Sequence, residues 1–239
     1  MTQGQIASGK FNNSVTTLDG SQRAYVNFDG LKTLWFNTGS LCNIACQNCY
    51  IKSSPQNNSL VYLSQNDVNE FLHKLCNDGY DTKEIGFTGG EPFMNPEIIP
   101  MTQSCLQEGY QVLILTNTMR PMMRPRVQKA LLELQNSFND QLTLRISLDH
   151  WSQVIHDKER GKGSYDQTLK GMRWLSENRF NMTIAGRALK AEKGKDFRQG
   201  YAKLFTKQGF DIDAFNPSKT VLFPEMDESA DVPEITTAC

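Results

Sequence analysis

Three cysteines, Cys42, Cys46 and Cys49, are crowded into eight consecutive residues that have neither a helical nor a strand period. Thiolates at these spacings can wrap one inorganic centre. An iron–sulfur cubane has four irons and normally takes four thiolates, so three protein ligands leave one iron open. An open position is what distinguishes a catalytic metal site from a structural one. The alternatives are a redox thiol cluster and a zinc site, for which the nearest histidine is His73 and a distant candidate ligand is Cys239.

A glycine-rich turn follows one strand and one helix later, at Gly89-Gly90-Glu91-Pro92. Two glycines let the polar atoms of a ligand approach the backbone without interference from a Cβ atom. The carboxylate of Glu91 can accept hydrogen bonds from a cationic amine. Such a motif alone is more often a plain turn, but its place after the cysteine segment favours a ligand site.

Two motifs in this order resemble those of the radical S-adenosylmethionine (radical SAM) superfamily: Cys42-x3-Cys46-x2-Cys49-Tyr50 and Gly89-Gly90-Glu91-Pro92. The resemblance runs from about Leu31 to Phe223. It implies a [4Fe–4S] cluster on the three cysteines, with SAM chelating the fourth iron through its amino and carboxylate groups. It also implies reductive cleavage of SAM to a 5′-deoxyadenosyl radical that takes hydrogen from a substrate. An electron donor such as flavodoxin or ferredoxin belongs to this chemistry.

The same resemblance assigns further residues to SAM. Tyr50 is expected near the adenine, and Gly89, Gly90 and Glu91 are expected to hold the methionyl amine. Asn117, which ends the third predicted strand, is a candidate for contact with the ribose or the substrate.

Residues after the fourth predicted strand resemble the peptide-modifying (SPASM/twitch-like) branches of the superfamily. Ser147 and Asp149 match a Ser-x-Asp pattern, and His156-Asp157-x-x-Arg160 matches a second motif, in which the arginine pairs with the SAM carboxylate. The substrate is therefore expected to be a peptide or protein rather than a nucleic acid.

Elementary chemistry supports three of these positions independently. A zwitterionic amino acid that carries a sulfonium and an adenine ring needs a hydrogen-bond acceptor for its amine, a cation for its carboxylate and a flat surface for its ring. Glu91, Arg160 and Tyr50 supply these, and the planar fork of arginine can bind both carboxylate oxygens. The alternatives are a solvated loop charge for Arg160, a cap for Asp149 and a core ring for Tyr50. His150 and His156 are interpreted as loop residues rather than acid–base catalysts.

The elements that must position these residues alternate along the chain. Strands are predicted at 33–38, 84–88, 111–116, 142–148, 182–188 and 220–223, and helices at 66–77, 96–108, 127–138, 164–178 and 197–207. This alternation predicts an α/β fold with a parallel sheet, and the family resemblance specifies a partial (β/α)6 TIM-like barrel. Ligands of such sheets bind at the carboxyl ends of the strands, where the unusual residues fall.

Composition limits the remaining possibilities. The 239 residues carry a net charge of −1, so no overall basic field favours nucleic acid or anionic lipid. No apolar run approaches membrane-spanning length, and the polar start lacks a signal segment, so a cytoplasmic enzyme with reduced thiols is expected. Cys76 and Cys105 are predicted to be buried. The alternative function is a non-catalytic iron–sulfur or zinc module, or an inactive truncated core.

The expected organisation has three parts. Residues 1–31 form an N-terminal extension, 32–223 the radical SAM core, and 224–239 an acidic C-terminal tail. Cys239 is interpreted either as the first cysteine of a further cluster-binding region or as a simple tail residue.

Overall fold

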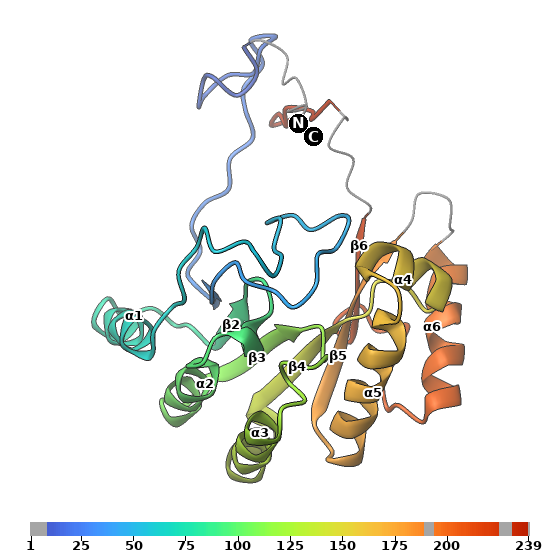
Figure 1. Ribbon diagram of the computed structural model, residues 1–239. Coiled ribbons are helices and arrows are strands. Elements are labelled where there is room, and N and C mark those ends of the chain that lie inside the picture. Colours follow the sequence, from blue (N-terminus) through green and yellow to red (C-terminus); the bar gives the residue numbers. More distant parts are fainter. Residues whose placement is uncertain (1–8, 189–193, 225–230, 239) are drawn as a thin grey trace. The chain divides into compact units, whose positions relative to one another are not determined.

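The computed structural model describes residues 9–188, 194–224 and 231–238, with the side chains of Gly194 and Lys195 left out. Its centre is a six-stranded sheet in which every strand pairs in parallel with the next one along the chain (Figure 1). The strands are β1 (Thr33–Asn37), β2 (Glu84–Thr88), β3 (Gln111–Thr116), β4 (Leu142–Ser147), β5 (Asn181–Ala188) and β6 (Thr220–Pro224). The sheet curls into a half-barrel, which confirms the predicted α/β fold.

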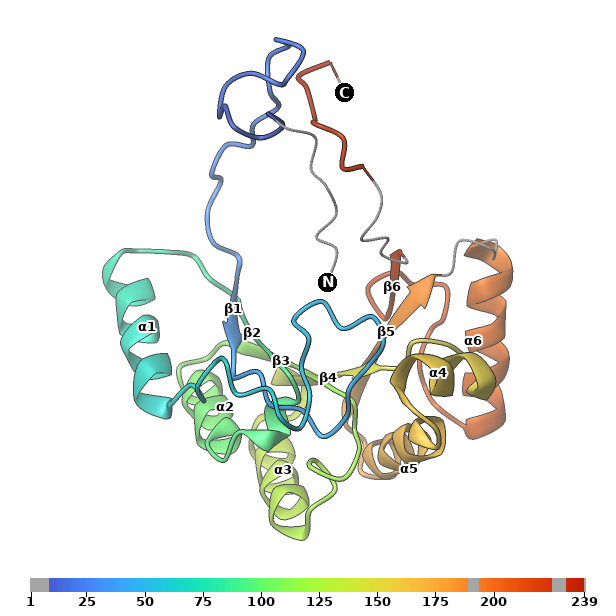
Figure 2. The same cartoon turned by 45° about the horizontal axis from the view of Figure 1, so that its top comes forward.

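Helices cover the outer side of the curl, as expected when sequential parallel strands are joined by crossovers of one hand. They are α1 (Gln65–Asn77), α2 (Ile98–Gln107), α3 (Pro125–Phe138), α4 (Gln153–Arg160), α5 (Ser164–Glu177) and α6 (Gly194–Gln208), with short 3₁₀ turns η1 (Pro92–Met94) and η2 (Asn139–Gln141). Figures 1 and 2 show α4 lying toward the carboxyl ends of β4 and β5 instead. Predicted and observed bounds differ most at the start of α6, which begins at Gly194 rather than at residue 197.

The prediction that His156 lies on a loop is wrong. His156 is on α4 and its side chain is fully buried. The helix has few apolar residues, and one of them, Val154, is 79% exposed, so no apolar period marks it in the sequence.

Strand β4 shows how the sheet separates its two faces. Leu142, Leu144 and Ile146 are completely buried, while Thr143, Arg145 and Ser147 between them are half-buried. Alternate side chains of a strand point to opposite faces, so the apolar set packs under the helices and the other set lines the inside of the curl. The inner face is therefore the more polar one.

The two cysteines predicted to be buried, Cys76 and Cys105, differ in their exposure to solvent. Cys105 on α2 is fully buried, as expected, but Cys76 on α1 is exposed, so that prediction is wrong. The buried positions of α1 are Val68, Leu72 and Leu75, and Cys76 lies beside this stripe rather than on it.

The chain separates into two compact units, one from Leu31 to Glu225 and one that combines the residues up to Gly30 with those from Met226 onward. In the second unit, Arg23 forms an ion pair with Glu234, and the backbone of Ala24 donates to the carbonyl of Ile235 at 2.8 Å. The predicted division at residues 31 and 223 remains a prediction, and Cys239 lies outside the described residues. In the part of the chain that is described, no helix is long and apolar enough to cross a membrane.

Candidate functional site

The cysteine segment belongs to a long loop, residues 38–64, between β1 and α1, which Figure 2 shows passing over the carboxyl ends of the strands. Its backbone is bonded to the glycine turn after β2. The amide of Gly90 donates to the carbonyl of Gly39 at 2.8 Å, and the amide of Glu91 donates to that of Leu41 at 3.0 Å. The two motifs singled out in the sequence are therefore direct neighbours.

The glycines of this turn are required by the loop itself. A Cβ atom on Gly90 would lie 2.1 Å from the carbonyl oxygen of Leu41, and one on Gly89 would lie 2.7 Å from that of Gly39. Gly89 also has a φ of 146°, which L side chains rarely adopt. On the side of each glycine where a side chain would begin, the space is therefore filled by the backbone of the cysteine loop.

Glu91 is buried and already well bonded. One carboxylate oxygen accepts from the hydroxyl of Thr116 at 2.8 Å and from the amide of Phe93 at 3.2 Å, and the other accepts from the amide of Asn117 at 2.8 Å. Burial raises the pKa of Glu91 to about 7, although these hydrogen bonds and the charge of Arg160 favour the ionised form. Since an ionised carboxylate offers about four acceptor positions, little capacity remains for a ligand amine. Glu91 thus ties the glycine turn to the end of β3.

Asn117 connects the end of β3 to the cysteine loop. Its amide nitrogen lies 2.9 Å from the Oδ1 of Asn43 and 3.9 Å from the Sγ of Cys42, and its Oδ1 accepts from the amide of Met119 at 3.0 Å. The side chain is buried. Asn117 therefore positions the first cysteine of the motif in this structure.

The three thiols differ in environment. Cys42 is buried, whereas Cys46 and Cys49 are half-buried and Cys49 accepts a hydrogen bond from the amide of Ser53 at 3.3 Å. Burial raises the pKa of Cys42 to about 12 and also raises that of Cys46, which the positive charges of Arg160 and Arg187 partly offset.

The donor set is a group of free thiols, which are the ligands that iron–sulfur clusters take. Among the described residues, no three His, Cys, Asp or Glu side chains converge closely enough to hold one metal ion. A zinc ion needs such convergence, because all of its ligands bind one centre. In a cubane each thiolate binds a different iron, so three free cysteines on one loop can serve without meeting at a point.

Asp149 and Arg160 form a buried ion pair between the loop after β4 and the end of α4. The Nε of Arg160 donates to one carboxylate oxygen at 2.8 Å and an Nη to the other at 3.0 Å. Only 13% of the arginine side chain and 7% of the aspartate side chain are exposed. Burial raises the pKa of Asp149, but the guanidinium outweighs it and the pKa is lowered. Arg160 is therefore not a solvated charge. Its Nε and one of its Nη atoms are already hydrogen-bonded to Asp149.

Sequence reasoning missed Arg187, on β5. One of its Nη atoms donates to the carbonyl of Asn48, within the cysteine loop, at 3.3 Å. Its Nε is buried and has no hydrogen-bond partner among the described residues. Arg187 is the only charged residue of this strand and lies near its end, and that is the signal that was available in the sequence. Arg187 supplies a second cation beside the cysteines.

Tyr50 and Ser147 lie at the edge of this region. The Tyr50 side chain is 66% exposed, which excludes the alternative of a core ring, and its hydroxyl lies 3.4 Å from that of Thr88. A flat ring next to the glycine turn is available for stacking. Ser147 is half-buried at the end of β4, paired with Ala185 of β5.

Comparisons with known proteins agree with this arrangement. Residues 36–198 match the model of the radical SAM superfamily. The antilisterial bacteriocin subtilosin biosynthesis protein AlbA of Bacillus subtilis (strain 168) is 33% identical over 145 residues, which cover 60% of this chain and 30% of AlbA. The mycofactocin maturase MftC of Mycolicibacterium smegmatis is 26% identical over 145 residues, covering 58% of this chain and 33% of MftC.

A solved structure gives the same fold. The crystal structure of Streptococcus suis SuiB bound to S-adenosylmethionine superimposes with a TM-score of 0.62 at 13% identity, covering 86% of this chain and 44% of SuiB. This chain spans about a third of the length of AlbA and MftC. The superfamily model matches well over half of the residues of this chain, and the matched range includes the cysteine loop and the glycine turn. The chain therefore belongs to the radical SAM superfamily.

Proposed function

We propose that this chain binds a [4Fe–4S] cluster through Cys42, Cys46 and Cys49 and uses it to cleave S-adenosylmethionine. When bound, the cluster supplies one electron to the sulfonium, which yields methionine and a 5′-deoxyadenosyl radical that takes hydrogen from a substrate. The observation that carries the proposal is the cysteine loop, bonded through its backbone to the Gly89-Gly90 turn at the carboxyl ends of the strands. The membership of the chain in the superfamily supports it.

The residues around the loop would bind and orient SAM. The exposed ring of Tyr50 suits the adenine, and the half-buried Ser147 suits a hydroxyl or carboxylate of the ligand. Backbone groups of Gly89 and Gly90, with the remaining acceptor capacity of Glu91, suit the methionyl amine. Arg160, braced by Asp149, would direct its remaining N–H groups toward the SAM carboxylate.

The remaining two positions have supporting roles. Asn117, which we expected at the ribose or substrate, would act by holding the loop at Cys42. Arg187 would add positive charge for the carboxylate of SAM, because its Nε is free of partners among the described residues.

The proposed substrate is a peptide or protein. AlbA is a bacteriocin biosynthesis protein, and MftC is a maturase. SuiB, whose fold this chain shares, has been crystallised with its precursor peptide SuiA. The electron would come from a flavodoxin- or ferredoxin-type donor.

The test is release of 5′-deoxyadenosine by the anaerobically reconstituted chain after reduction in the presence of SAM. The Cys46→Ser variant is expected to lose iron and the product together, whereas Cys76→Ser changes an exposed cysteine outside the loop and should keep both. Absence of 5′-deoxyadenosine from a sample that holds four irons per chain would refute the proposed activity. Zinc without iron or sulfide in the isolated protein would instead support a structural metal site.

A further inference from the structure

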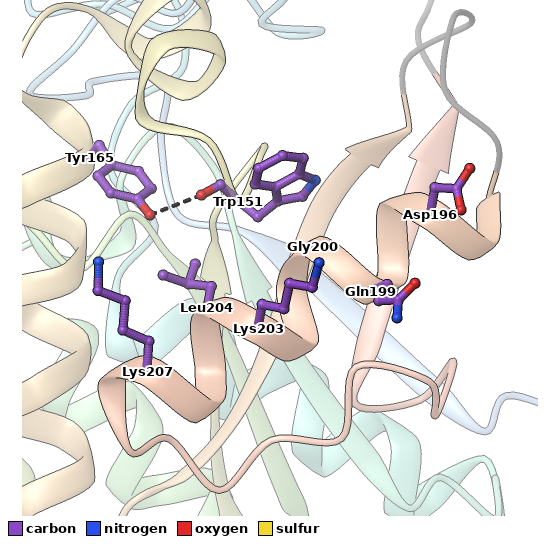
Figure 3. A pocket seen from close by; sticks show the side chains of 8 residues that line it. All are labelled: Trp151, Tyr165, Asp196, Gln199, Gly200, Lys203, Leu204 and Lys207. Carbon is purple, nitrogen blue, oxygen red and sulfur yellow. Dashed lines mark hydrogen bonds between the residues drawn. The ribbon is translucent and has the colours of Figure 1, made fainter.

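A cavity of about 450 Å³ lies outside the half-barrel, between the loop after β4, α5 and α6 (Figure 3). Its walls are the rings of Trp151 and Tyr165, and its floor is Leu204. Lys203 and Lys207 extend from α6 along its rim, one toward Trp151 and the other toward Tyr165. None of these residues belongs to the cysteine loop or the glycine turn. The volume suits one or two side chains of a ligand rather than a folded domain.

The aromatic walls are held in place by the fold. A Cβ atom on Gly200 of α6 would lie 2.3 Å from the Nε1 of Trp151, so the indole packs against the helix at a position that has no side chain. The hydroxyl of Tyr165 donates to the carbonyl of Trp151 at 2.9 Å, which fixes this loop to α5. The ring of His150 packs against Trp151 on one side, with centroids 4.8 Å apart, and against Phe197 on the other. The cavity is therefore formed before any ligand arrives.

The charge at its rim is positive. Lys203 and Lys207 stand four residues apart on one face of α6, where like charges repel. Neither forms an ion pair with any residue that the structure describes, and Asp196 is the only acidic side chain among the lining residues. Two cations on either side of an apolar floor match an apolar side chain that has carboxylates on both sides.

We propose that this cavity is a docking site for an acidic segment of a peptide substrate. An aromatic or aliphatic side chain of the segment would enter between Trp151 and Tyr165, and flanking Asp or Glu residues would pair with Lys203 and Lys207. The proposal rests on the proposed peptide-modifying function. It adds a recognition site on the outside of the sheet, two residues along the chain from Asp149, where the segment can be held while another part of the same peptide reacts.

The test uses the reconstituted full chain and two labelled peptides, acetyl-Asp-Glu-Phe-Glu-Asp-amide and its neutral counterpart acetyl-Asn-Gln-Phe-Gln-Asn-amide. Fluorescence anisotropy measures the dissociation constant of each, with no SAM present. We expect the acidic peptide to bind at least tenfold more tightly. Lys203→Glu and Lys207→Glu should each weaken it about tenfold. Lys74→Glu, the same charge change on an exposed lysine of α1, should not.

A steric variant tests the aromatic wall without changing charge. Gly200→Ala would push Trp151 away from α6 and should weaken binding of the acidic peptide, with circular dichroism confirming that the protein is folded. The proposal is overturned if the two peptides bind equally, if Lys74→Glu acts as strongly as Lys203→Glu, or if a single-stranded oligonucleotide binds more tightly than the acidic peptide. Since this assay needs no turnover, its result is separate from the release of 5′-deoxyadenosine, and either proposal can fail while the other stands.

Discussion

The buried pair of Asp149 and Arg160 provides the sharpest prediction about stability. Asp149→Asn keeps the size and shape of the side chain but removes its charge, leaving a guanidinium that is only 13% exposed without its counter-ion. Arg160 cannot avoid this energetic cost by losing its proton, because arginine stays charged in proteins. The neighbouring carboxylate and thiols also raise its pKa despite burial. Breaking a buried pair by removing one partner costs about 3–5 kcal/mol.

That cost is a large fraction of the total free energy of unfolding of a typical domain. Domains are typically stable by about 5–15 kcal/mol, and for a chain of about 150–250 residues each kcal/mol shifts the melting temperature by about 2–4 °C. We therefore expect Asp149→Asn to lower the melting temperature by about 6–20 °C. Urea unfolding at pH 7, with matched iron content, measures the free energy directly.

The matched control is Asp81→Asn. Asp81 forms ion pairs with Lys32 and Lys83, but its side chain is 64% exposed, so the same chemical change should lower the stability far less than Asp149→Asn does. The double variant Asp149→Asn/Arg160→Met removes both charges and should recover most of the loss. A cost for Asp149→Asn no greater than that of Asp81→Asn would refute this reasoning.

The same pair predicts a pH dependence. The pKa of Asp149 is lowered in the folded state, so the stability from the pair is present above the ordinary aspartate pKa of about 3.9 and is lost as the pH falls through the lower folded value. The difference between wild type and Asp149→Asn should shrink in that acid range.

Two further predictions concern single positions. Gly90→Ala places a methyl group 2.1 Å from the carbonyl oxygen of Leu41 and should displace the cysteine loop, measured as loss of iron on reconstitution. Gly109→Ala strains the backbone at a φ of 88° but adds a carbon with no atom within 4 Å, so it should retain iron. His156 is fully buried, with both ring nitrogens unpartnered among the described residues, and burial lowers its pKa to about 4. Its neutral form therefore supports folding above pH 6.5, and stability should fall by up to about 1.4 kcal/mol per pH unit between pH 6.5 and 4. His156→Leu should flatten this part of the urea-unfolding profile, and an unchanged slope would contradict the assignment.

Short-range patterns in the sequence predicted most of the elements. The apolar run of β3, the alternation of β4 and the 3.6-residue period of α5 are local signals, and burial in the structure follows them. The signal failed at α4, where the buried residues are His156 and Glu159 rather than apolar ones. The helical period also gave the wrong burial for Cys76, which is exposed. Periodicity locates the buried face of a helix but does not settle which residues at the edge of that face are buried.

The sequence alone determined the order of the chemistry: a three-cysteine segment, then a Gly-Gly-Glu-Pro turn, each after a strand of a parallel sheet. Tertiary structure decided what each group touches. Glu91 reaches the amide of Asn117, 26 residues away, and the thiol of Cys42 lies near the side chain of the same Asn117, 75 residues away. The fork of Arg160 is committed to Asp149, which the motif did not indicate. Spacing and periodicity are properties of neighbouring residues, whereas these partners depend on how separate strands and loops pack at one edge of the sheet, so only the folded chain could specify them.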